Sequence, residues 1–224
     1  AFSSRHQYLI LSIGLGRTND NQMNELSRRS KLIIAFIVMV VGGGILTYVA
    51  SVSPGVSTAF IEARMQGALI SQGIVQISQK SPTALEEISK LDRAGNYAKA
   101  LELTNQMIAE NKEIKIKALS LAKELETMTK SLESISSDEA RDAALRSISN
   151  RLAMISRLIQ YSDSLEKLLE TLKLRFSGVS YGQTTAIRIL LTEINESVTA
   201  INSFDREARE AINEFDSIVN TGTK

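Results

Sequence analysis

The feature that most limits what this chain can become is an uncharged run of 22 residues, Leu32–Ser53. As an α-helix that rises about 1.5 Å per residue, the run would be about 33 Å long, enough to cross a hydrocarbon core of roughly 30 Å. Arg28, Arg29 and Lys31 precede it directly. We therefore predict one transmembrane helix over 32–53, and we expect the rest of the chain to be tethered to the lipid bilayer.

The distribution of charge predicts the orientation of this span. Residues 1–31 contain five Lys or Arg and two acidic residues, whereas residues 54–224 contain 21 basic and 23 acidic residues. Basic residues that flank a span stay on the cytoplasmic side. We therefore expect 1–31 to be a short cytoplasmic segment and the long C-terminal part to be extracytoplasmic. The balanced charge beyond the span argues against nucleic acid as a partner, because phosphate binding requires a clustered basic face.

The segment before the span raises two further expectations. Met23 is followed by a short polar stretch, the basic cluster and the span, which is the order of a bacterial-type signal anchor. We expect translation to begin at Met23 and residues 1–22 to be an upstream extension. A cleavable signal peptide with Val49-Ala50-Ser51 as its cleavage site is the alternative. The apolar run exceeds the 7–15 residues of a typical signal core, which favours a retained anchor.

Small residues recur on one face of the predicted span. Gly43, Thr47 and Ser51 are spaced four apart, and small residues at this spacing let another transmembrane helix approach closely. We predict a helix contact here with other membrane protein subunits or with a second copy of the chain. The alternative is that the triplet Gly42-Gly43-Gly44 only loosens the helix.

The composition favours an all-α fold. The chain has two Pro, no Trp and no Cys, so its core must be built from Leu, Ile, Ala and Met, which suits helices packed on helices. We predict one N-terminal transmembrane helix followed by an antiparallel bundle of three long helices, with one or two shorter ones. Residues 54–80 would form a membrane-proximal helix or linker, lying on the membrane or packed on the main domain, and 81–224 the extracytoplasmic bundle.

Apolar residues spaced alternately three and four apart, here called a seam, mark the three long helices. The seam of the first helix, 97–133, consists of Ile114, Ala118, Leu121, Leu125, Met128, Leu132 and Ile135. The second comprises Leu145, Ile148, Leu152, Ile155 and Ile159, then Leu165, Leu168, Leu172 and Phe176. The third comprises Ile187, Leu191, Ile194, Val198, Ile201, Asp205, Ala208, Ile212, Phe215 and Val219. Helices of similar length joined by short turns are expected to fold back on one another.

Two polar signals within this pattern predict local features. Ser81 is expected to cap a short helix that begins at Pro82, and Ser136 with Glu139 has capping-box spacing. Asp205 is the single polar member of the last seam. We interpret it as a polar residue that sets register or partner choice, paired with an Arg of a neighbouring helix. Alternatively, Phe204 turns inward and Asp205 lies at the rim.

Residue types needed for catalysis are scarce beyond the span. His6 is the only histidine and belongs to the N-terminal segment, so a histidine-based acid–base pair or metal site is not expected in the bundle. We expect no cofactor and no enzymatic activity. The leading interpretation is a membrane-anchored, non-catalytic scaffold or accessory subunit of a membrane protein assembly. A sensory or ligand-binding extracytoplasmic bundle that signals through a partner is the alternative.

Overall fold

The computed structural model describes residues 56–179 and 184–221. Of these residues 91% are helical and none forms a strand, so the prediction of an all-α fold is confirmed for this part of the chain. The helices are α2 (Thr58–Ser78), α3 (Ser81–Arg93), α4 (Tyr97–Lys130), α5 (Asp138–Phe176) and α6 (Thr184–Thr221), with a short 3₁₀ helix η1 (Leu132–Ser134) between α4 and α5.

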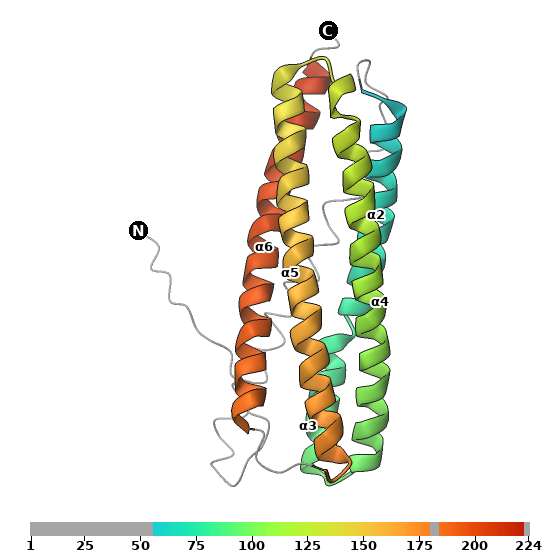
Figure 1. The fold of residues 1–224 in the computed structure, drawn as a ribbon, viewed down its shortest axis with the longest axis vertical. Coiled ribbons are helices and arrows are strands. Elements are labelled where there is room, and N and C mark those ends of the chain that lie inside the picture. The colour runs from blue at the N-terminus through green and yellow to red at the C-terminus, as the bar shows by residue number, and fades with distance from the viewer. Residues whose placement is uncertain (1–55, 180–183, 222–224) are drawn as a thin grey trace, which may run out of the picture.

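The helices form four columns with alternating direction (Figure 1). Helices α2 and α3 follow one another along α4 and together make one interrupted column. Helix α5 packs against both α4 and α6. The 34, 39 and 38 residues of α4, α5 and α6 correspond to lengths of about 51–58 Å. The described part is therefore an elongated four-column bundle, in which α4, α5 and α6 are the three predicted long helices and the shorter α2 and α3 form the fourth column.

Most of the predicted seams lie in the core. All seven residues of the α4 seam are buried, and the α6 seam is buried or half-buried throughout. In the first half of the α5 seam Ile148 and Ile155 are buried as predicted, but Leu145 and Leu152 were wrong, because they are 44% and 42% exposed. Small side chains point inward there instead and let α6 pack closely, and the Ser147 hydroxyl donates to the Ala208 carbonyl at 2.9 Å. A pattern of large apolar residues does not reveal such a contact.

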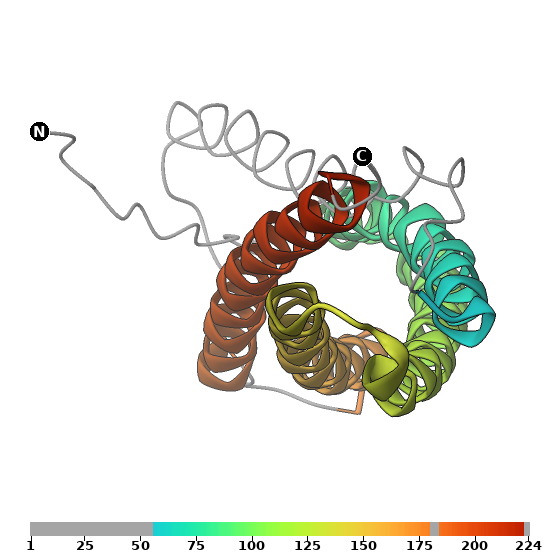
Figure 2. The same cartoon turned by 90° about the horizontal axis from the view of Figure 1, so that it is seen from above.

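Helix α2 contributes to this core and extends the bundle toward the N-terminus. Phe60 is 1% exposed, and its ring lies 5.4 Å from that of Phe215 in α6. A Cβ atom added to Gly67 would lie 3.2 Å from the Leu121 side chain, so glycine permits the close approach of α2 to α4. Seen along its axis, the bundle includes α2 as one of its columns (Figure 2). Helix α2 therefore packs on the main domain, which is one of the two arrangements expected for 54–80.

The helix starts differ from the predicted ones by one residue. Ser81 is the first residue of α3 and follows Lys80, whose side chain makes no capping bond. The start of α5 is capped by Ser137, which accepts from the Ala140 N–H at 3.2 Å, and not by the predicted box of Ser136 and Glu139. The next serine along can make the same bond, so sequence spacing alone does not choose between them.

No helix in the described part of the chain combines the length and the hydropathy needed to cross a bilayer. The predicted span over 32–53 lies outside the described residues, and so do its contact residues Gly43, Thr47 and Ser51 and the segment 1–31. The anchor, its orientation and the start at Met23 therefore stay predictions.

Candidate functional site

Polar side chains inside the bundle are the candidates for function. Among the described residues, no group of three or more His, Asp or Glu is placed to hold a metal ion. Interior polar groups instead gather at three places: between α4 and α5, between α3 and α5, and among α2, α5 and α6. The hydrogen bonds and charges at each place decide what chemistry it can support.

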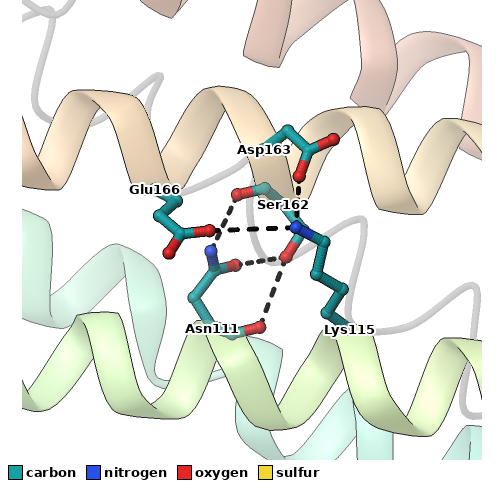
Figure 3. Close-up of polar contacts among 5 residues, drawn as sticks. All are labelled: Asn111, Lys115, Ser162, Asp163 and Glu166. Carbon is teal, nitrogen blue, oxygen red and sulfur yellow. Dashed lines mark hydrogen bonds and ion pairs between the residues drawn. The ribbon is translucent and has the colours of Figure 1, made fainter.

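Asn111 of α4 and Ser162 of α5 form a buried hydrogen-bonded layer (Figure 3). The Asn111 Nδ2 donates to the Ser162 carbonyl at 2.7 Å, and the Ser162 hydroxyl donates to Asn111 Oδ1 at 2.8 Å. Beside them the Lys115 ammonium donates to Asp163 and lies 3.8 Å from Glu166. The bond to Asp163 raises the pKa of Lys115. Every group in this layer has a partner, so it fixes the register of α4 on α5.

We expect Asn111→Ala to lower the free energy of unfolding by about 1–3 kcal/mol, because it removes the two buried hydrogen bonds between the Asn111 side chain and Ser162. Urea denaturation followed by circular dichroism measures this change. Gln106→Ala is the matched control, since Gln106 is an exposed residue of the same helix that bonds only to Glu110 in the structure. Equal midpoints for the two variants would show that the layer does not contribute to stability.

The second place joins α3 to α5. Asp92 is buried, and its Oδ2 lies 2.9 Å from Nη2 of Arg175. Asp92 also borders a small pocket whose other walls are mostly apolar; they are Leu85, Ile88, Ser89, Leu168, Leu172, Phe176 and Leu191. The ion pair of Asp92 with Arg175 therefore links the C-terminal part of α3 to that of α5.

The third place is a group of charged residues that we call the arginine cluster: Arg64 of α2, Arg151 of α5, and Asp205, Arg209 and Asp216 of α6. Arg64 binds Asp216 through two hydrogen bonds of 2.7 and 2.8 Å, which link α2 to α6. Arg209 donates from Nε to Asp205 at 2.8 Å, one turn along the same helix. Both acidic residues of the cluster are thus already bound to an arginine.

Asp205 lies inside the bundle, with 6% of its side chain exposed. The alternative that placed it at the rim is therefore wrong, although Phe204 is half-buried beside it. Its direct partner is Arg209 of its own helix, and Arg151 of the neighbouring helix acts on it at longer range. Burial raises the pKa of Asp205, and the two arginines oppose this shift. A role in partner choice stays a prediction.

Arg151 is the residue of the cluster that sequence reasoning missed. It lies one turn from Ile148 and one turn from Ile155, within the buried face of α5. Burial lowers the pKa of Arg151, and Asp205 opposes this change. The Arg151 side chain is half-buried, and none of its nitrogen atoms is among the buried atoms of the described residues that lack a hydrogen-bond partner. A seam through Ala144, Ile148 and Ile155 would have included Arg151 in the buried face of α5. Leu145 and Leu152 have the same spacing and predicted a different buried face.

Comparison with known proteins does not identify a function for this chain. No protein-family model, curated protein or solved structure matches this chain.

Proposed function

We propose that the protein is a membrane-anchored, non-catalytic scaffold or accessory subunit of a membrane protein assembly. The bundle would act as a stiff rod that projects from the membrane, and partners would contact both the bundle and the span. The observation that supports this most is the use of interior polar groups for joining helices. Asn111 pairs with Ser162, Asp92 with Arg175, and Arg64 with Asp216.

Such pairing favours a structural role over catalysis. An active site requires polar groups that converge on a shared space and remain available to a substrate. In the described residues, each of these pairs instead satisfies its members across two helices. Buried polar groups that are fully paired specify register and rigidity, which suits a scaffold.

Exposed apolar residues offer surfaces for partners on two neighbouring helices. Met65 and Leu69 lie one turn apart on α2, and Ile116 and Leu119 lie one turn apart on α4. Large apolar side chains that are grouped on a surface are typical of protein contact sites. A sensory or ligand-binding bundle that signals through a partner is the alternative.

The proposal predicts that partners depend on the small-residue face of the span. Changing Gly43 and Ser51 to Leu should leave membrane insertion intact, because the segment stays apolar and long enough. It should abolish association with a partner helix, because bulky side chains prevent close approach. The measurement is co-purification of companion proteins with the tagged full chain after extraction in mild detergent.

The matched control changes Ile37 and Ile45 to Leu, which keeps size and hydropathy. We expect this control to retain all companions. Recovery of the same companions with both double variants would contradict the contact face. Absence of any stoichiometric companion, including a second copy of the chain, would contradict the scaffold proposal as a whole.

A further inference from the structure

The charged residues of the bundle are separated along its long axis. The segments 90–99 and 170–179 meet at the end where α3 passes into α4 and α5 ends, and they contain five basic and two acidic residues. The segments 130–142 and 212–221 at the opposite end contain two basic and six acidic residues. We call the first of these the basic end. Charge that is nearly balanced over the chain is therefore positive at this end of the bundle.

Two basic side chains at the basic end exceed the acidic ones. The other three are matched by a neighbouring acidic residue; the pairs are Arg175 with Asp92 at 2.9 Å, Lys173 with Glu170 at 3.7 Å, and Lys90 with Glu86 at 3.3 Å. The two in excess, Arg93 and Lys99, are exposed to solvent. The Arg93 Nε donates to the Ser89 carbonyl of its own helix at 3.3 Å, which does not neutralise its charge.

Helix dipoles account for only part of this pattern. A basic residue is favourable near a helix C-terminus, and Arg93 lies in the last turn of α3. Lys99 lies in the first turn of α4, where a positive charge is unfavourable. The stability of α4 therefore does not explain the position of Lys99.

Large apolar side chains are exposed at the same end. Tyr97, Leu174 and Val179 are 49%, 43% and 70% exposed. The Tyr97 ring stacks on that of Phe176 with centroids 6.2 Å apart, which joins the start of α4 to the end of α5. The Val179 N–H donates to the Leu174 carbonyl at 3.1 Å, so the chain folds back over the last turn of α5. The basic end thus combines excess positive charge with exposed apolar surface.

Both turns at the basic end are held by the same hydrogen-bond pattern. Gly95 and Gly178 have φ angles of 71° and 74°, which favour glycine. Their N–H groups donate to the carbonyls of Asp92 and Arg175, each at 3.1 Å, and so end α3 and α5. A surface built on two such turns is formed before a partner binds, which lowers the entropic cost of binding.

We propose that the basic end is a docking surface for an acidic protein segment that carries large apolar side chains. The acidic side chains of the segment would bind Arg93 and Lys99. Its apolar side chains would cover Tyr97, Leu174 and Val179. Charge complementarity selects an acidic partner, because two basic ends repel each other. The inference rests on the proposed scaffold role and names the chemistry of one partner.

The position of the basic end favours a protein partner over the membrane that anchors the chain. Thr58, the first residue of α2, lies at the opposite end of the bundle (Figure 1). The 34 residues of α4 alone span about 51 Å. With the predicted span before α2, the basic end projects away from the bilayer. The acidic end of a second copy in the same membrane would lie beside the bilayer, out of reach of this surface.

Peptide binding to the full chain in phosphatidylcholine nanodiscs tests the docking surface. The probe is a short fluorescein-labelled peptide rich in Glu and Asp, with Leu or Phe at every fourth position, and fluorescence anisotropy measures its binding. We expect saturable binding that weakens when salt is raised from about 50 to about 300 mM. Arg93→Gln with Lys99→Gln should weaken binding about three- to tenfold, and Val179→Ser about fivefold.

Lys112→Gln with Lys123→Gln is the matched control. Both lysines are exposed residues of α4 outside the basic end, so this variant loses the same charge and should keep its affinity within about twofold. Arg93→Glu with Lys99→Glu reverses the excess charge. It should bind a lysine-rich counterpart of the peptide more tightly than the wild type does, which is a gain that a misfolded variant would not show.

Three results would overturn the proposal. The first is the absence of saturable peptide binding by the wild type, and the second is an equal loss in the two double glutamine variants. The third is association that depends on Arg93 and Lys99 but involves phosphatidylserine vesicles or a second nanodisc, and not the peptide. Companion proteins that are retained through the span while the peptide does not bind would overturn this inference and leave the scaffold proposal intact.

Discussion

Replacing Leu125 by aspartate should unfold the bundle at room temperature. Leu125 is 2% exposed in the centre of α4, so the new carboxylate would be buried without a partner. Such a change costs several kcal/mol and also removes the apolar contacts of the leucine. Because domains of this size are stable by only about 5–15 kcal/mol, this cost is a large part of the total. Far-ultraviolet circular dichroism and the melting temperature measure the loss.

Leu119→Asp is the matched control for this substitution. Leu119 lies six residues earlier in the same helix and is 59% exposed, so the carboxylate stays in water. We expect its melting temperature to remain close to that of the wild type. If Leu125→Asp and Leu119→Asp melted alike, the assignment of the α4 seam to the core would be wrong.

Removal of α2 should have an effect of similar size. The fragment 81–224 lacks four apolar residues that are buried in the full bundle: Phe60, Ala63, Ile74 and Val75. Loss of a single large core side chain costs about 2–5 kcal/mol, so the loss of several exceeds what a domain of this size can tolerate. We therefore expect the fragment to be largely unfolded or aggregated, whereas 56–224 should fold.

Urea denaturation of the two fragments, followed by circular dichroism, measures this difference. Fragment 56–224 should show one cooperative transition. A transition of 81–224 with an equal midpoint and slope would mean that α3 to α6 are sufficient, and that α2 only rests on their surface.

The sequence was sufficient to predict the helical class and the seams of α4 and α6. In both helices large apolar residues repeat without a break, and this pattern can be satisfied only by burial of one face. The prediction was wrong at Leu145 and Leu152 of α5, because small residues such as Ala143 and Ser147 are buried there instead. Their close packing depends on the shape of the partner helix, which a single helix pattern does not contain.

The column formed by α2 was ambiguous for a related reason. Gly67, Ser71 and Gly73 interrupt its apolar residues, so the pattern suited a membrane surface as well as a core. In the structure Gly67 and Ser71 are buried, and Gly67 lies against Leu121. Small residues in a helix can indicate a close contact with another helix. Only the structure shows whether the helix packs on the bundle or lies on a membrane.

The candidate site could be predicted only in part. Asp205 could be predicted as an interior polar residue, because the other members of its seam are apolar and define the buried face of the helix. The ion pair of Arg64 with Asp216 joins residues 152 positions apart, and no local spacing relates them. Arg151 was hidden by two leucines whose spacing formed an equally regular pattern. To predict charge pairs between helices that are far apart in the sequence, one must know the register of the whole bundle.

A pair of cysteines placed on α2 and α6 tests most directly whether α2 closes the bundle. The chain has no cysteine of its own, so Arg64→Cys with Asp216→Cys introduces the only two thiols. These positions contact one another in the structure at 2.7 Å. Arg64→Cys with Glu102→Cys is the control, because residue 102 lies near the start of α4, toward the opposite end of the bundle.

A short bismaleimide reagent is added to the full chain in membranes or mild detergent, and the cross-linked fraction is measured by intact mass and peptide mapping. If α2 is a column of the bundle, the 64–216 pair should cross-link within one chain in high yield and the 64–102 pair should not. Equal, low yields from the two pairs in a protein that is fully helical would contradict the four-column bundle.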